Sequence, residues 1–236
     1  MFKLKSKKNN CILKIFLNKN NDETLRRELF FLDYCSKIKI HVVPKVLDYG
    51  KNYIFLSELK GFKPKKFSKD GFYQAVRFIF YLNRNKIKNY KFDAVENGKN
   101  LKNLKYFKDK KILRVSKLIK KEKKKEIHIL MNQIKTLWKL EKKKLFANKS
   151  IKFTKIISPS DFGIHNTFYF KKKYFFHDFE YSGIDSLEKL VSDFVINPNS
   201  NFQVSEATKV VKKFDDIFNL NSKLNKNFLI IGYLVL

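Results

Sequence analysis

A loop followed by two short aromatic runs, residues 158–180, constrains the fold of this 236-residue chain more than any other stretch. The loop carries Asp161 and Asn166, and three lysines separate the two runs. Aromatic residues favour strands, so we expect the runs to pair as a hairpin centred on Lys172. Asn166 and Asp178 would then lie opposite each other, roughly 5 Å apart. An amide oxygen and a carboxylate at that separation are suited to share one hard cation, which predicts a metal–phosphate site.

The composition indicates a folded chain with a very high positive charge. It is 44% hydrophobic and 16% aromatic, and its formal net charge is +30, nearly all from lysine. Such a charge raises nucleic acid or an anionic membrane surface as a partner. The joint excess of Lys, Asn, Ile, Phe and Tyr is also typical of an A+T-rich coding bias, in which case the charge says little about function. We expect no specific nucleic-acid partner.

The cysteines and the hydropathy pattern indicate a cytoplasmic protein. Cys11 and Cys35 lack CxxC spacing and lie in apolar contexts, which favours reduced packing residues. The sequence has no signal peptide and no run of eighteen apolar residues, so we expect no membrane insertion. The apolar stretch 228–236 is too short to span a bilayer, and we expect it to form a closing helix or strand.

The order of predicted elements indicates an α+β fold with a small sheet-rich lobe, 1–60, and a larger helical lobe, 61–236. In the first lobe we expect a hairpin formed by 2–5 and 11–17, followed by a helix at 22–37. A strand at 42–47, a turn at 48–50 and a second strand at 53–57 come after the helix. In the second we expect helices at 70–83, 113–144 (broken near 121–125), 183–196 and 206–218, with an irregular connection at 85–105. The catalytic loop would be 158–166 and the metal-binding hairpin 167–180.

Carboxylates are scarce in this basic chain, so a cluster of them is informative. Asp161, Asp178, Glu180 and Asp185 fall within 25 positions, beside Asn166. Mg²⁺ prefers hard oxygen ligands, which Asn166 and Asp178 supply. Asp161 has no cationic neighbour in sequence and is suited to accept a proton from an attacking hydroxyl.

The spacing Asp-x4-Asn, followed by a hairpin that ends in Asp-Phe, resembles the catalytic arrangement of the protein-kinase-like fold. The context resembles the aminoglycoside phosphotransferase and choline kinase family, which reads His-Gly-Asp-x4-Asn and then Ile-Asp-Phe-Glu. The matching segments here are Pro159-Ser160-Asp161 to Asn166, and His177-Asp178-Phe179-Glu180. The resemblance implies a bilobal fold, ATP and Mg²⁺ as cofactors, and a small-molecule hydroxyl as acceptor.

The resemblance also implies roles for individual residues. Asp161 would be the catalytic base, and Asn166 and Asp178 the magnesium ligands. The remaining candidates are Lys14 on the phosphates, Glu28 orienting Lys14, Glu58 and Leu59 at the nucleotide-binding hinge, and Ser160, Glu180 and Asp185 in support. His165 and His177 are interpreted as ordinary loop and strand residues.

Three departures from the family pattern bear on activity. Pro159 replaces the motif histidine, so the loop must be held in another way. The later motif Asp-Pro-x-x-Asp-Leu lacks its second aspartate after Asp185, for which Asp193 is the nearest substitute. No glycine precedes Gly50, so the glycine-rich loop that would cover the ATP phosphates is missing. The last departure indicates either an N-terminally shortened chain or a degenerate member.

The sequence therefore predicts an ATP- and Mg²⁺-dependent kinase that phosphorylates a sugar or an amino-alcohol, as in surface polysaccharide metabolism. Residues 85–150 have little acid to spare for a polycation, which disfavours aminoglycosides as acceptors. Two alternatives stay open: a catalytically degenerate kinase-like binding protein, and a basic nucleic-acid-binding protein. The oligomeric state is not indicated by the sequence.

Overall fold

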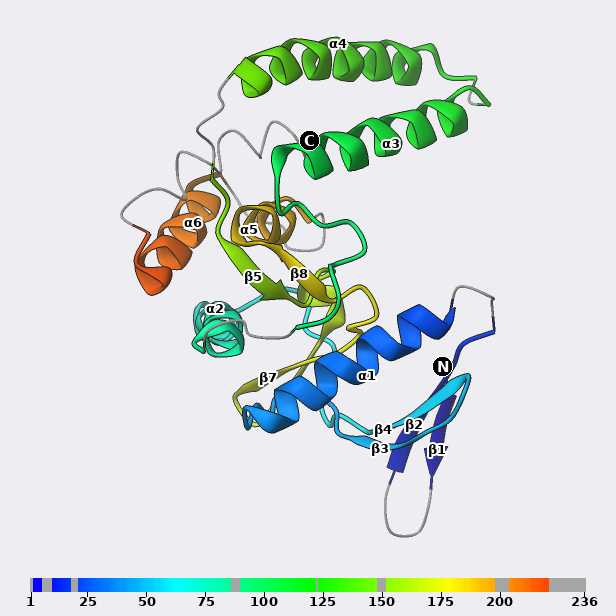
Figure 1. Cartoon of the computed structure of the whole chain (residues 1–236), viewed down its shortest axis with the longest axis vertical. Helices are drawn as coiled ribbons and strands as arrows, with labels where there is room; N and C mark the ends of the chain where they lie inside the picture. Colours follow the sequence, from blue (N-terminus) through cyan, green and yellow to red (C-terminus); the bar gives the residue numbers. More distant parts are fainter. Residues whose placement is uncertain are drawn as a thin grey trace.

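The computed structural model describes residues 2–5, 10–17, 21–85, 90–121, 123–147, 152–197 and 204–220. It shows a small lobe of strands and one helix, and a larger, mainly helical lobe (Figure 1). The elements of the small lobe are β1 (Phe2–Lys5), β2 (Asn10–Ile15), α1 (Asn21–Lys37), β3 (Val46–Tyr49) and β4 (Tyr53–Ser57). Those of the large lobe are α2 (Lys69–Asn83), α3 (Leu101–Ile119), α4 (Lys125–Ala147), β5 (Lys155–Ser158), the 3₁₀ turn Ile164–Asn166, β6 (Thr167–Phe170), β7 (Lys173–Phe176), β8 (Gly183–Ser186), α5 (Leu187–Ile196) and α6 (Val204–Phe218).

The small lobe is a four-stranded antiparallel sheet in the order β1-β2-β4-β3, with α1 packed against it. Buried residues of α1, among them Phe31 and Cys35, join Ile54 of β4 in the core because they lie on the helix face turned to the sheet. The predicted hairpin, helix and second strand are confirmed. The expected turn at 48–50 is wrong in part, since β3 continues through Tyr49 and pairs with β4 across an irregularity.

The large lobe differs from the sequence prediction at two places. The expected break near 121–125 in the helix 113–144 is confirmed, since α3 ends at Ile119 and α4 begins at Lys125. The first difference is that α3 begins at Leu101, where the Asn100 side chain caps it by accepting a hydrogen bond from the Asn103 amide (2.9 Å). The expected helix 183–196 begins four residues later, because Gly183–Ser186 form β8 and pair with β5. The helices at 70–83 and 206–218 are confirmed within two residues at their starts.

The lobes are joined by a shared core and by a short bridge. Phe31 of α1 stacks on Phe179, which follows the β6–β7 hairpin, at 4.4 Å between ring centroids. After β4, the chain turns at Gly61 with φ +115°, and Phe62 exchanges two backbone hydrogen bonds with Tyr169 of β6. A side chain at Gly61 would meet the Tyr169 carbonyl oxygen, so this close approach requires glycine.

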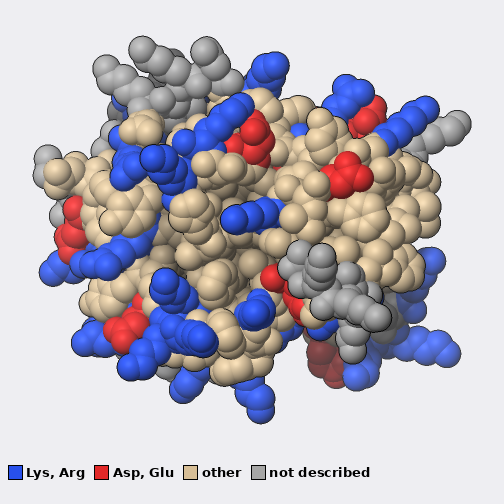
Figure 2. Space-filling view, turned by 90° about the horizontal axis from the view of Figure 1, so that it is seen from below, with Lys and Arg blue, Asp and Glu red and all other residues tan. Residues whose placement is uncertain are grey.

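The surface shows where the excess charge lies. Figure 2 shows Lys and Arg side chains dispersed over one face among wide uncharged areas, with Asp and Glu between them. Among the described residues, no helix is both long and apolar enough to cross a membrane. The closing segment predicted at 228–236 lies outside the described residues.

Candidate active site

The β6–β7 hairpin forms as predicted, but its register is shifted by one residue. Phe170 pairs with Lys173, so the turn consists of Lys171 and Lys172, both with positive φ. Two-residue hairpin turns of this kind match the twist of the strands. Asn166 consequently lies opposite His177, whose amide donates to the Asn166 carbonyl (3.1 Å), and not opposite Asp178 as the expected centre at Lys172 required.

Asp161 lies on a loop that is held from several sides. Asn166 Nδ2 donates to the Asp161 backbone carbonyl (2.9 Å) and lies 3.3 Å from its carboxylate. The Ser160 amide donates to Ser158 Oγ (3.0 Å), and Ser160 takes a positive φ of 67°. The ring of Phe162 is buried in the aromatic core directly after Asp161. These contacts hold the loop without the motif histidine that Pro159 replaces.

His165 contacts the Asp161 carboxylate, which the sequence interpretation missed. Its Nε2 lies 3.1 Å from Asp161 Oδ1, and its Nδ1 lies 3.4 Å from Asn197 Nδ2 at the end of α5. The two ring nitrogens of His165 thus contact the Asp161 carboxylate on one side and the Asn197 amide on the other. The spacing of four residues between Asp161 and His165 was the available signal in the sequence.

Lys14 contacts three carboxylates, one in its own lobe and two in the large lobe. The side chain projects from β2, is 8% exposed, and places Nζ 2.8 Å from Glu28 Oε2 of α1. The same nitrogen lies 2.7 Å from Asp178 Oδ1 and 2.7 Å from Glu180 Oε2. The expected pairing of Lys14 with Glu28 is therefore present, and the structure adds both acidic residues that follow the hairpin.

Charge and burial oppose each other at this cluster. Burial alone would lower the pKa of Lys14, but the charges of Glu28 and Asp178, with hydrogen bonds to Asp178 and Glu180, hold that pKa above its usual value. Burial raises the pKa of Glu28, while the charge of Lys14 acts in the opposite direction. The ammonium group therefore stays charged at neutral pH and neutralises part of the acidic cluster.

The donor atoms near Asp178 fit a hard divalent cation. One oxygen from each of Glu28, Asp178 and Glu180 lies within 4.8 Å of the others. Asp178 takes a positive φ of 67°, which turns its carboxylate toward Lys14 at the end of the hairpin. Asn166 uses its Nδ2 on Asp161, and among the described residues its Oδ1 makes no hydrogen bond. Carboxylate and amide oxygens are the ligands that Mg²⁺ takes from proteins.

The hinge candidates lie between β4 and Gly61. Glu58 follows the last residue of β4 and pairs with Lys3 of β1, while Leu59 is half-buried. This segment is the chain connection from the small to the large lobe (Figure 1).

Asp185 is fully buried and lies at a structural junction. It accepts hydrogen bonds from the backbone amides of Gly98 and Ser186, and lies 3.5 Å from Lys189 Nζ. Burial raises the pKa of Asp185, and the charge of Lys189 opposes that shift. Lys189 also pairs with Asp193 (2.5 Å), so both acids bind one lysine of α5. Asp185 thus anchors the loop before α3. None of its described contacts is with Asp161 or Lys14.

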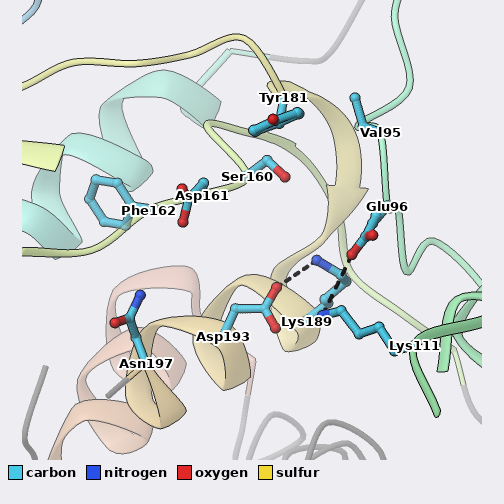
Figure 3. Close-up of a pocket in the computed structure, with 10 residues that line it drawn as sticks. All are labelled: Val95, Glu96, Lys111, Ser160, Asp161, Phe162, Tyr181, Lys189, Asp193 and Asn197. Atoms are coloured by element: carbon cyan, nitrogen blue, oxygen red, sulfur yellow. Dashed lines mark hydrogen bonds and ion pairs between the residues drawn. The ribbon is translucent and has the colours of Figure 1, made fainter. Parts of the chain in front are cut away.

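A cavity of about 450 Å³ opens beside Asp161. Figure 3 shows Asp161, Phe162 and Tyr181 at one side, Asp193 and Lys189 of α5 at another, and Lys111 of α3 beside Glu96 at the third. Glu96 pairs with Lys111 (3.5 Å), as Asp193 does with Lys189. Asp161 is therefore the acid of this cavity that no lysine neutralises among the described ion pairs.

No family model matches the chain. No curated protein matches its sequence. Among solved structures, an ADP-bound aminoglycoside phosphotransferase, APH(2'')-Ib, aligns at TM-score 0.63 and 16% identity, covering 95% of this chain and 80% of that one.

Two further structures extend the likeness across the family. Choline kinase from Cryptosporidium parvum aligns at TM-score 0.58 and 12% identity over 95% of this chain and 74% of that one. The aminoglycoside phosphotransferase APH(3'')-Id from Streptomyces rimosus, with ADP and streptomycin, aligns at TM-score 0.55 and 11% identity over 96% and 86%. The chain therefore has the two-lobed fold of the aminoglycoside phosphotransferases and choline kinases, as the loop and hairpin at 158–180 predicted.

Proposed function

We propose that this protein transfers the γ-phosphoryl group of ATP, with Mg²⁺, to a hydroxyl group of a small molecule. The observation that carries the proposal is the Lys14 cluster, in which one ammonium group of β2 binds Glu28 of α1 and both Asp178 and Glu180, which follow the β6–β7 hairpin. A buried lysine among three acids is costly unless its charge is used, and phosphate binding uses it. The solved structures with this fold include ADP-bound phosphotransferases.

Each proposed role follows from the local contacts. Lys14, oriented by Glu28, contacts the α- and β-phosphates, since a lysine whose pKa is raised keeps its charge. Asp161 accepts the proton of the acceptor hydroxyl, while His165 and Asn166 hold its carboxylate in place. Glu58 and Leu59 contact the adenine base at the hinge. Ser160 and Glu180 support this arrangement, and Asp185 supports the wall of the acceptor cavity.

Asn166 and Asp178 are the residues that would hold Mg²⁺, and Glu180 lies close enough to assist. The bound ion supplies charge neutralisation at the phosphates. With the ion bound, Asp178 would serve as its ligand, and Lys14, which lies 2.7 Å from Asp178 Oδ1, would supply positive charge beside the phosphates. Transfer depends on this positioning and on electrostatics rather than on a covalent intermediate.

We propose a neutral polyhydroxy compound or an amino-alcohol as the acceptor. The cavity acids Glu96 and Asp193 are each bound by a lysine, which leaves Asp161 as the acid without a lysine partner there. A polycationic aminoglycoside needs several unpaired acids, so this cavity suits it poorly. A sugar needs hydrogen-bonding groups, which Tyr181, Ser160 and Asn197 provide. A place in surface polysaccharide metabolism is compatible with such an acceptor.

The lobe division at 60/61 and the missing glycine-rich loop remain predictions, and the β1–β2 turn lies outside the described residues. A kinase-like protein that binds nucleotide without turnover is therefore the second candidate. We also propose a cytoplasmic location, where ATP is available and where the free Cys11 and Cys35 stay reduced.

The test is ATP turnover and nucleotide binding by purified protein. We expect ATP with Mg²⁺ to raise the melting temperature of the wild type but not of Asp178→Asn, because the second protein lacks the charged ligand. Asp161→Asn should still bind ATP but lose phosphoryl transfer to a panel of sugars and amino-alcohols. Asp33→Asn, which breaks only an exposed ion pair with Lys37, is the matched control.

The outcomes separate the candidate functions. Binding without turnover in the wild type would establish the degenerate kinase. Absence of any ATP effect on the wild type would overturn both. Affinity for a DNA or RNA duplex that persists at physiological salt would instead favour the nucleic-acid alternative, since nonspecific charge contacts weaken steeply with salt.

A further inference from the structure

The α3–α4 hairpin has an apolar surface that no described part of the chain covers. Helix α4 is the outermost layer of the large lobe, with α3 between it and α5 (Figure 1). Its inner side buries Met131 and Trp138, and the Trp138 indole donates to Asp109 of α3 (2.6 Å). Four large residues on the other side are exposed by 49–61%; we call Ile129, Leu130, Leu137 and Leu140 the outer stripe.

The spacing of the outer stripe places its members together. Successive residues of an α-helix are rotated by about 100°, so positions 129, 130, 137 and 140 fall within about a third of the circumference. The stripe therefore consists of two apolar pairs on one side of α4, 129 with 130 and 137 with 140, and the exposed Gln133 lies between the two pairs on that side. Surface hydrophobics scattered singly are ordinary, but a strip of four on one helix marks an interaction surface.

The same hairpin carries a concentrated positive charge. Residues 101–147 contain 17 Lys and Arg against four Asp and Glu, a net charge of +13 within a chain whose total is +30. On α4, the exposed Lys135, Lys139 and Lys143 recur every four residues and form a row along one border of the outer stripe. Apolar and basic groups thus lie side by side on one helix.

The apolar stripe and the row of lysines together distinguish among the partners that could bind the outer face of α4. A second copy of the chain would bring two hairpins of charge +13 together, which opposes burial of the stripe. Nucleic acid would satisfy the lysines but leave the leucines in water. An anionic bilayer satisfies both, because an amphipathic helix lying in the interface buries its apolar strip beneath the headgroups while its lysines meet lipid phosphates. We propose that the outer face of α4 binds the surface of an anionic lipid bilayer.

The proposal is independent of the catalytic activity but gives the enzyme an orientation. Lys111 of α3 lines the cavity beside Asp161, so the hairpin belongs to the acceptor side of the molecule. Binding is peripheral and reversible, since none of the described helices is apolar enough to span a membrane.

The test is co-sedimentation of the full chain with lipid vesicles, either pure phosphatidylcholine or phosphatidylcholine with about a third phosphatidylglycerol. We expect binding to the anionic vesicles only, weakened by salt. The double variant Leu130→Gln/Leu137→Gln should bind at least about tenfold more weakly, because it removes half of the apolar strip. The matched control is Leu17→Gln/Leu47→Gln, which alters two leucines exposed by 83% and 54% in the small lobe.

Circular dichroism and melting temperature establish that both variants fold like the wild type, as substitutions at exposed positions should. Equal binding by wild type and the stripe variant would overturn the proposal, as would equal binding to both kinds of vesicle or none to either. A wild-type dimer in light scattering that the stripe variant abolishes would also overturn it, and would assign the stripe to self-association.

Discussion

Replacing Lys14 by methionine should destabilise the protein in a pH-dependent manner. The substitution keeps most of the side-chain volume but leaves Glu28, Asp178 and Glu180 close together without the cation that lies 2.7–2.8 Å from each of them. Breaking a buried ion pair from one side costs about 3–5 kcal/mol. Asp178 and Glu180 are partly exposed, so we expect a loss of about 3 kcal/mol at pH 7.5. For a chain of this length that lowers the melting temperature by ~6–12 °C.

The pH dependence follows from the fully buried Glu28. Burial already raises its pKa, and loss of the Lys14 charge removes the main opposing influence. In the folded variant, Glu28 therefore stays protonated in a pH range where the same group in the unfolded chain has lost its proton. The stability of the variant consequently rises as the pH falls through that range. We expect the gap between wild type and Lys14→Met to shrink from pH 7.5 to pH 5.

Urea denaturation at both pH values measures this gap. Lys3→Met is the matched control, because Lys3 pairs with Glu58 at a more exposed position and should cost less than about 1 kcal/mol. Magnesium without nucleotide should partly rescue Lys14→Met, since the three acids then bind the ion; ~10 mM Mg²⁺ with a dissociation constant of ~1 mM returns ~1.4 kcal/mol. A variant as stable as the wild type at pH 7.5, or a gap that does not change with pH, would refute the reasoning.

Three further predictions concern single side chains. Gly61→Ala should lose more than about 1 kcal/mol in urea denaturation, because φ is +115° and the new methyl group would meet the Tyr169 carbonyl oxygen; unchanged stability would contradict this geometry. In a Cys11→Ser background, Cys35 should react with a thiol reagent only on unfolding, because it is fully buried and burial raises the pKa of its thiol; rapid labelling of the native protein would disprove it. Lys108→Met should stabilise the protein by about 1 kcal/mol at pH 7, allowing for solvent screening at the ammonium tip. Burial and the neighbouring Lys111 charge lower the pKa of Lys108 to about 8 in the folded protein. The wild type therefore becomes more stable as the pH rises from 8 toward the higher pKa that Lys108 has in the unfolded chain, and the advantage of the variant should shrink in thermal melts at pH 9.5. A stability difference that stays constant with pH would contradict the buried charge as its cause.

The residues of the candidate site were predictable because each belongs to a local pattern of regular geometry. Lys14 stands alone in an apolar strand, and Glu28 lies near the apolar face of an amphipathic helix, and the resemblance to the kinase-like family implied that the two meet. Asp178 follows an aromatic hairpin, which locates it although its side-chain direction depends on a positive φ. These signals are short-range, and short-range patterns survive in a single sequence.

The errors come from features that a single sequence leaves ambiguous. Three consecutive lysines permit either a two- or a three-residue turn, and the structure assigns Lys173 to β7, which shifts the register by one. The start of α3 was missed because Lys108 occupies a buried position that a hydrophobic pattern reserves for an apolar residue. The strand β8 was missed because its four residues form a strand only by pairing with β5, which lies far away in sequence.

Two of the three departures from the family motifs have a local replacement in the candidate site. Asn166 and Ser158 hold the loop beside Pro159, and Lys189 joins Asp185 to Asp193 where the second motif aspartate is absent. The Lys14 ammonium group also stays paired with Glu28, Asp178 and Glu180, so the candidate site retains the cation that phosphate binding would use. Measuring both the affinity for ATP and the rate of ATP turnover therefore distinguishes an active kinase from a protein that only binds nucleotide. If only the phosphate cover is weakened, ATP should bind weakly while Asp161 still controls the rate of transfer once the nucleotide is saturating.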